Sequence, residues 1–291
     1  MERSLLKIGK YLIIIVLCLL CQSVFSQRSG GEIRKDILSI KKKYYGRSKP
    51  DKKTNLPVKK KFTGEECFDR AIYLLTVKHD NSKAFEWMMK GAKLNDGPCE
   101  FLCGISYEGG VITSQDMFKA ADYYYRAANR GVVRAMALLG DCYYYGTGVS
   151  QNYRQSFYWL DKAASYGDSH AQNSLGIYYS EGDAEEPNMT LAASYFEKSA
   201  KAGNAQGQYG LACRYLFGEG RLQDSKTGLY WMHKSAEQND VEAMRSLGTL
   251  YWAGELGIIP NKEKAIYWME KAAKAGDRDA LDALPIMRRN M

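Results

Sequence analysis

Histidine and proline are scarce in this chain of 291 residues, which has three histidines and six prolines. Few prolines leave long stretches free to form helices, because proline interrupts a helix interior. The histidines, His79, His170 and His233, lie far apart and form neither H-x-x-x-H nor H-E-x-x-H, so we expect no metal site and no cofactor. The sequence also lacks a phosphate-binding loop, and residues 104–108 (GISYE) lack the final glycine of a nucleophile elbow. We therefore expect no catalytic activity.

Long apolar runs are also missing, with one exception near the N-terminus, at Leu12–Leu20. Three basic residues precede this run, and Val24-Phe25-Ser26 suits cleavage before Gln27. This pattern predicts a secretory signal peptide over residues 1–26, and hence an exported protein. We expect a periplasmic location, because the signal is short and no disulfide framework is present. Two alternatives stay open, namely the lumen of the endoplasmic reticulum and a membrane anchor formed by an uncleaved signal.

A strongly basic segment follows at residues 28–61, where 13 Lys and Arg stand against three Asp and Glu, a net charge of +10. Subtracting this charge and the +2 of residues 1–27 from the total of +8 leaves −4 for the remainder of the chain. The basic character of the protein therefore belongs to this segment and not to the part that follows it.

Four apolar residues of the basic segment, Ile33, Ile37, Ile40 and Tyr44, recur at helical spacing and predict an amphipathic helix over residues 32–45. One interpretation of residues 27–62 is contact with an anionic membrane surface or an acidic partner. The other is a solvated linker in which one helix docks as an N-terminal cap. We expect no contact with nucleic acid, which an exported protein rarely meets.

The rest of the chain repeats about every 36 residues, most clearly in Ala135–Gly167, where Gly146 and Gly148 separate two short helical patterns. One large aromatic residue recurs in each second helix, at Trp87, Tyr123, Trp159, Tyr195, Trp231 and Trp268. Seven residues before each aromatic stands a predicted N-cap, Asp80, Asp116, Asn152, Asn188, Asp224 or Asn261. Eight residues after each stands a predicted left-handed C-cap, Asn95, Gly131, Gly167, Gly203, Asn239 or Gly276.

The first helices repeat as well, through a pair of Leu and Gly. The pair stands at Leu139-Gly140, Leu175-Gly176 and Leu247-Gly248, and we interpret Cys103-Gly104 and Tyr209-Gly210 as its variants. A second pattern, K-A-x-x-W-x-x-K-A-A-x-x-G, follows in the second helices and is clearest from Lys264 onward. From about Thr63 to the C-terminus the chain thus resembles the Sel-one-like repeat, a branch of the tetratricopeptide-repeat superfamily.

This resemblance implies an all-α fold, a right-handed α-solenoid (superhelix) of about six helix-turn-helix repeats, acting as an adaptor for a protein or peptide partner. We expect the six large aromatic residues to fill the core of the stack. The predicted units lie near residues 63–96, 97–131, 132–167, 168–203, 204–239 and 240–276, and residues 277–291 form a C-terminal capping helix.

The resemblance also implies that the first helices line a concave groove. We counted two, six and nine residues from the start of each apolar stripe, taken as Cys99, Ala135, Ala171, Ala205 and Ala243. Large apolar side chains at such positions suit a peptide with spaced apolar anchors. The alternative is burial of several of them against a neighbouring first helix. The candidate partner-binding residues are Phe101, Ile105, Tyr144, Ile177, Leu211, Arg214, Arg245 and Trp252.

Five cysteines lie outside the predicted signal peptide, at positions 67, 99, 103, 142 and 213. Because five is odd, at least one is free or paired between chains. A single bridge, such as Cys67–Cys99, stays open after export, and buried free thiols are the other interpretation. A cysteine-rich branch of the family carries C-x7-C bridges, and β-lactam binding has been attributed to it. No two cysteines here have that spacing, which argues against membership of that branch. An envelope hydrolase acting on a β-lactam or cell-wall peptide is nevertheless the alternative function.

Overall fold

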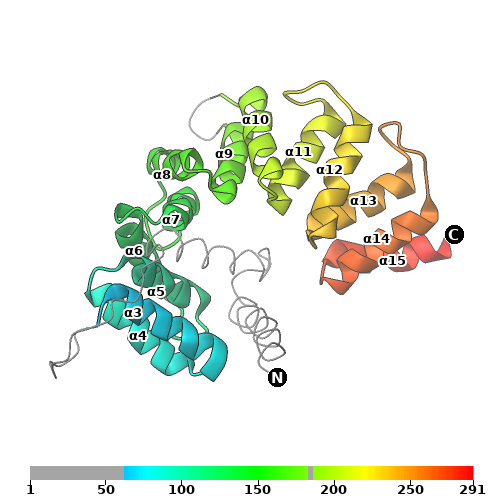
Figure 1. The fold of residues 1–291 in the computed structure, drawn as a ribbon. Helices are drawn as coiled ribbons and strands as arrows, with labels where there is room; N and C mark the ends of the chain where they lie inside the picture. The colour runs from blue at the N-terminus through cyan, green and yellow to red at the C-terminus, as the bar shows by residue number, and fades with distance from the viewer. Residues whose placement is uncertain (1–61, 183–185, 291) are drawn as a thin grey trace, which may run out of the picture. The chain divides into compact units, whose positions relative to one another are not determined.

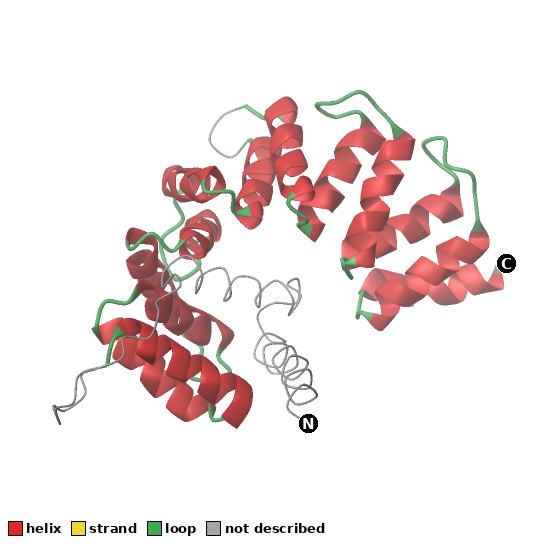
Figure 2. Ribbon diagram, viewed as in Figure 1, coloured by secondary structure: helices red, strands yellow, loops and turns green. Residues whose placement is uncertain are grey.

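The computed structural model describes residues 62–182 and 186–290, and within these ranges every regular element is a helix (Figure 1, Figure 2). The expected all-α class is therefore confirmed. The predicted signal peptide and all but the last residue of the basic segment 27–62 lie outside the described residues. In the part of the chain that the structure describes, no helix combines the length and the apolar character needed to cross a membrane.

The helices alternate as first and second members of hairpins. The first helices are α3 (Gly64–Tyr73, continued by the π-helix η1, Leu74–Lys78), α5 (Gly97–Gly109), α7 (Val133–Tyr145), α9 (Ser169–Glu181), α11 (Ala205–Phe217) and α13 (Val241–Ala253). The second helices are α4 (Asn81–Lys93), α6 (Met117–Asn129), α8 (Tyr153–Ser165), α10 (Met189–Lys201), α12 (Ser225–Glu237) and α14 (Lys262–Lys274). A last helix, α15 (Arg278–Arg289), stands where the cap is expected.

The chain divides into two compact units between Trp159 and Leu160. In the first unit α3 packs on α4, α4 on α5, α5 on α6 and α6 on α7. In the second unit the same succession runs from α9 to α15. Within each unit, each hairpin thus stacks on the next, which is the arrangement of an α-solenoid. The right-handed sense of the superhelix stays a prediction.

Side-chain caps stand at the start of most helices, although α7, whose N-cap residue is Val132, begins without one. All six predicted Asp and Asn caps of the second helices accept a hydrogen bond from the backbone N–H three residues further on. Asp96, Asp168, Asn204 and Asp240 cap first helices in the same way, which we had not predicted. The predicted left-handed residues after the second helices all have positive φ, between 60° and 94°.

The side chain that fills each hairpin lies one position after the large aromatic residue. Trp159 and Trp268 are buried, but the other four aromatics are only partly buried, so the expectation that all six fill the core is wrong. The glycine of the first helix makes room for the residue that follows, because a Cβ on Gly104, Gly176 or Gly248 would come within 2.7 Å of it. The residues that follow the aromatics, all buried, are Met88, Tyr124, Leu160, Phe196, Met232 and Met269.

Two of the partly buried aromatics lie instead along the seam between the two helices of a hairpin. Tyr123 stacks on Tyr107 with ring centroids 5.8 Å apart, and Tyr195 stacks on Tyr179 at 5.5 Å. Each pair joins a first helix to its own second helix. These rings therefore stabilise the hairpin from its edge and leave the centre to the following residue.

The fifth hairpin has a register two residues away from the predicted one. Leu211 lies 36 residues after Leu175 and 36 before Leu247, and it is buried like both of them. Our alignment of Tyr209-Gly210 with the Leu-Gly pairs is therefore wrong. Gly210 is small for another reason, since a Cβ there would come 2.5 Å from the ring of Phe196 in the preceding hairpin.

Candidate protein-interaction surface

One position of the first helices stays accessible in every hairpin from the second to the sixth. It recurs every 36 residues, and its occupants, none of them buried, are Ile105, Asp141, Ile177, Cys213 and Thr249. In the second unit Tyr209 and Arg245 stand one turn before Cys213 and Thr249 and are also partly exposed. We call Ile177, Tyr209, Cys213, Arg245 and Thr249 the first-helix face.

Consecutive first helices touch one another along this face. α9 contacts α11 directly. The Ser246 hydroxyl on α13 donates a hydrogen bond to the Tyr209 oxygen on α11, with 3.5 Å between the oxygens. Arg245 on α13 donates to Asp279 on α15 at 2.7 Å, and its Nε lies 3.3 Å from an oxygen of Asp277. The first-helix face is therefore continuous through the second unit.

The inner sides of the same residues pack on the core. Ile177 lies against the cluster that contains Phe196 and Leu211. Tyr209 and Cys213 lie against the cluster around Leu247. A side chain that is already held against the core on one side and is accessible on the other loses little conformational entropy when a partner binds it.

Two predicted partner-binding residues are not accessible. Phe101 and Leu211 are each only 1% exposed. The Phe101 ring packs on Tyr124 at a centroid distance of 6.1 Å, and Leu211 packs with Phe196 and Ala200. Their placement on an open groove is therefore wrong. In Leu211 the cause is the two-residue register error, and in Phe101 it is the close approach of a neighbouring helix.

The two predicted arginines are held in internal ion pairs. Arg245 belongs to the first-helix face but binds Asp277 and Asp279 at the start of the capping helix α15. Arg214 lies on another side of α11, toward α10, where its Nη1 is 3.1 Å from the sulfur of Met189. It also pairs with Glu219 at 2.9 Å. Arg214 therefore fastens the fifth hairpin to the fourth.

Tyr144 and Trp252 lie at the loop ends of α7 and α13. The Tyr144 ring contacts Tyr145 and Tyr153 at centroid distances of 4.8 and 5.5 Å. Lys262 Nζ lies 5.5 Å from the centroid of the Trp252 ring. Both rings are partly exposed, as are Ile105 and Ile177. Their contact with a partner stays a prediction.

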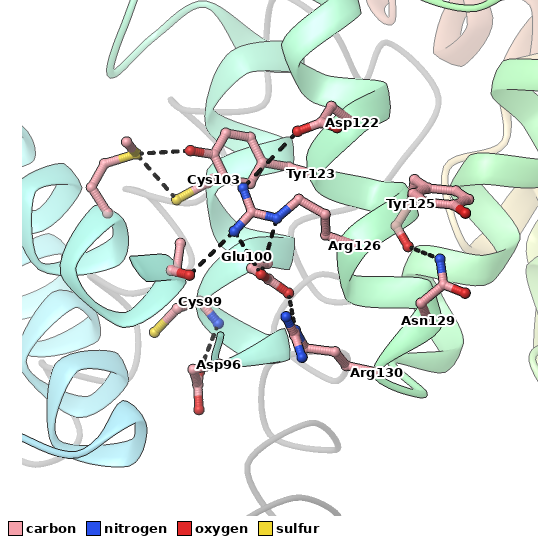
Figure 3. A network of polar contacts seen from close by, with 12 residues as sticks. Asp96, Cys99, Glu100, Cys103, Asp122, Tyr123, Tyr125, Arg126, Asn129 and Arg130 are labelled. Atoms are coloured by element: carbon pink, nitrogen blue, oxygen red, sulfur yellow. Dashed lines mark hydrogen bonds and ion pairs between the residues drawn. The ribbon is translucent and has the colours of Figure 1, made fainter. Parts of the chain in front are cut away.

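A buried carboxylate that sequence reasoning missed lies between α4, α5 and α6 (Figure 3). Glu100 is 0% exposed, and its two oxygens accept hydrogen bonds from Arg126 (3.1 and 2.8 Å) and Arg130 (2.8 Å). Arg126 also donates to the carbonyl oxygen of Ala92 on α4, at 3.2 Å. The available signal was a single acid at a position where other hairpins carry Met136, Gln172, Gln208 or Met244. The carboxylate on α5 is thus paired with two arginines of α6, and Arg126 also binds α4, so this group of contacts joins three helices.

The thiols of this surface and of the core are poor nucleophiles. Burial raises the pKa of Cys103 and of Cys142 to about 12, and it also raises the pKa of Cys213. A thiol with such a pKa is protonated at neutral pH, whereas the thiolate is the reactive form. Within residues 62–182 and 186–290 no group of three or more His, Cys, Asp and Glu side chains has the geometry to hold a metal ion.

Fold and surface together define a tandem array of helical hairpins, a class of protein that presents an extended face to other molecules. A model of the Sel1 repeat matches six segments, residues 69–96, 98–132, 133–168, 169–204, 205–240 and 241–277, and the chain belongs to the Sel1 repeat family. Proteins of this family are generally protein-interaction scaffolds and not catalysts.

A Sel1 repeat protein from Oxalobacter formigenes has a similar structure, with a TM-score of 0.68 and 28% sequence identity over 84% of this chain and 98% of that chain. An immunity protein from Pseudomonas aeruginosa shares the fold, with a TM-score of 0.51 and 16% identity over 79% of this chain and 89% of its own. The chain is also similar over a shorter stretch to the Activator of C kinase protein 1 of Saccharomyces cerevisiae, with 39% sequence identity over 66 residues. That similarity spans 22% of this chain and 11% of the yeast protein.

Proposed function

We propose that this protein is an exported scaffold without catalytic activity, which binds an extended protein segment along the first-helix face. The observation that carries the proposal is the recurrence of one accessible position on consecutive first helices that touch one another. Because the spacing is regular, the face offers contacts at regular intervals to an extended partner.

The chemistry of the face favours a partner with apolar anchors. Ile177 and Cys213 supply small apolar contacts on α9 and α11. Arg245 is already neutralised by Asp277 and Asp279, so the face has no free cation that would select an acidic ligand. Trp252, which is large and of a type frequent in binding hot spots, suits one end of a segment bound to the second unit. Tyr144 is a candidate contact of the first unit.

Site-specific photo-crosslinking in cells tests the binding face. A photoreactive residue replaces Ile177 or Thr249 on the face, and a matched control replaces Tyr230, an exposed residue on α12. We expect the same discrete protein to be linked from both face positions and not from the control. Equal yields from Tyr230, or no specific product from the face, would contradict the proposal.

Export rests on the sequence of residues 1–27 and is tested separately. We expect the mature chain to begin at Gln27 and to fractionate with the periplasm. A chain that keeps Met1 and sediments with membranes would show the anchored form instead. We also propose contact between residues 28–61, of net charge +10, and an anionic membrane surface, which co-sedimentation with anionic and neutral vesicles would test.

The scaffold function also predicts that the purified chain does not hydrolyse a chromogenic β-lactam. Turnover that disappears on substitution of a single Ser or Lys would show a catalytic centre and would contradict the proposal. A trace of turnover that survives every such substitution would point to a contaminating enzyme.

A further inference from the structure

Two buried cysteines from neighbouring first helices meet over a glycine of the helix between them. Cys67 lies on α3 and Cys99 on α5, and both are completely buried. A methyl group on Gly91 of α4 would overlap the Cys99 sulfur and would lie 2.7 Å from Cβ of Cys99 and 3.2 Å from Cβ of Cys67. The two Cβ atoms are therefore at most about 5.9 Å apart, the sum of these distances.

A disulfide needs about 3.5–4.5 Å between its Cβ atoms. The gap between Cys67 and Cys99 is within a small shift of α3 from that range, and α3 packs mainly on α4 and α5. Glycine at position 91 leaves this space open. The equivalent residues of the other second helices all carry side chains, and they are Ala127, Ala163, Ser199, Ser235 and Ala272.

The remaining thiols of the described chain lie in other surroundings. The Cys103 sulfur is 3.8 Å from the sulfur of Met89, Cys142 is on α7, and Cys213 is on α11 in the second unit. None of the five is bridged in this structure. Cys67 and Cys99 are thus the pair that the fold brings together from different hairpins.

We infer that Cys67 and Cys99 are a disulfide site, oxidised when the chain folds in the presence of a small-molecule disulfide such as oxidised glutathione. The bridge would tie the first helix of the first hairpin to that of the second. The inference rests on the positions of the two side chains and does not depend on the proposed scaffold function or on the compartment.

The reaction is two successive thiol–disulfide exchanges. One cysteine, as the thiolate, attacks a sulfur of oxidised glutathione, so that one glutathione thiolate leaves and a mixed disulfide forms. The other cysteine then attacks the protein sulfur of that mixed disulfide and displaces the second glutathione. The two cysteines lose two electrons and two protons in total, and the oxidant becomes two molecules of glutathione.

Burial determines when this exchange takes place. Neither thiol is exposed in the folded chain, and burial raises the pKa of both. Oxidation therefore occurs while the chain folds, or when the first hairpin opens, and the finished bridge is shielded from reductant. We expect it to form readily during refolding and slowly in the prefolded, reduced protein.

Peptide mapping tests the pairing directly. The full chain, with Cys18→Ser and Cys21→Ser to remove the two cysteines of residues 1–26, is refolded with reduced and oxidised glutathione, alkylated and cleaved with trypsin. We expect residues 62–70 to be linked to residues 94–119, with two of the five cysteines protected from alkylation. Because residues 94–119 contain both Cys99 and Cys103, the map is repeated in Cys103→Ser, which should keep the link.

The controls make the result decisive. Cys142→Ser should leave the linked pair unchanged, and Cys67→Ser or Cys99→Ser should abolish it. Hydrogen exchange supplies a second readout, and we expect amides of α3 to exchange roughly a hundredfold more slowly in the oxidised chain. Five alkylated cysteines after oxidative refolding, or a link through Cys103, would overturn the inference even if the scaffold function stands.

Discussion

The ring of Phe196 packs against the bare backbone of Gly176, where a Cβ would come 2.7 Å from ring carbon Cδ1. The same ring faces Gly210 of the next hairpin, where a Cβ would come 2.5 Å from the same carbon. One side chain of α10 therefore fills the space inside its own hairpin and also the space between two hairpins. The close spacing of α9, α10 and α11 depends on these two glycines.

Gly176→Ala tests this packing. Helix propensity alone would make the variant about 1 kcal/mol more stable. We expect instead a net loss of roughly 1–3 kcal/mol in the free energy of unfolding by urea, because the new methyl group overlaps the Phe196 ring. Adding Phe196→Leu should recover part of the loss of the single variant. A stabilised Gly176→Ala protein would show that the ring moves aside freely.

Removal of a buried aromatic and removal of a helix cap should differ in size. Trp159→Ala empties a buried site and should cost about 3–5 kcal/mol, enough to unfold the central hairpins. Asn152→Ala removes one hydrogen bond, to the backbone N–H of Gln155, and should cost about 1 kcal/mol. Thermal melts followed by circular dichroism compare the two, and equal melting temperatures would contradict the assignment of Trp159 to the core.

Glu100→Ala should be among the most harmful changes in the first unit. It leaves Arg126 and Arg130 without their shared carboxylate, and breaking a buried pair costs about 3–5 kcal/mol. Because the arginine side chains are 35% and 39% exposed and reach water, we expect the lower end of that range. The matched control is Asp122→Ala, an exposed residue 4.0 Å from Arg126, which should change stability by no more than about 0.5 kcal/mol. Similar losses for both variants would contradict a special role of Glu100.

His233 should make the second unit less stable in acid. It lies on α12 with a ring nitrogen 2.9 Å from the Tyr251 hydroxyl oxygen, and burial lowers its pKa below the usual value, with Glu237 opposing and Lys264 adding to the shift. A lowered folded-state pKa means that the neutral ring is favoured in the folded protein. Stability is therefore full above the unfolded pKa of about 6.5 and falls as the pH drops below it.

The measurement is the urea midpoint at pH 5 and pH 8 for the native chain and for His233→Gln. We expect the native chain to lose more stability between pH 8 and pH 5 than the variant does. The difference between the two proteins separates His233 from the many carboxylates, which titrate in both. An identical pH dependence in the two proteins would contradict this prediction.

The period of the sequence was enough to predict the caps and the succession of helices, because Asp, Asn and Gly act locally. The period was not enough to predict which residue of a given helical turn is buried in the core. The large aromatic residue of each second helix is the obvious candidate for the core, yet its neighbour one position later, such as Phe196 or Met269, is the one that faces the glycine. A difference of one position is about 100° around a helix, which only packing decides.

The errors in the candidate site have the same origin. Gly210 resembles the glycine of a Leu-Gly pair, but it is small because Phe196 approaches from the preceding hairpin, and following it placed Leu211 on the surface. Glu100 looks like a solvent-exposed acid until Arg126 and Arg130 are seen beside it. Contacts between helices determine these residues, within one hairpin for Glu100 and between two hairpins for Gly210.

Hydrogen exchange of the protein with and without the partner captured from Ile177 is the most direct test of the proposed binding face. We predict slower exchange in α9, α11 and α13 on binding, with little change in α10, α12 and α14. Protection that falls mainly on the second helices, with the first helices unchanged, would contradict the proposal that the first-helix face binds the partner.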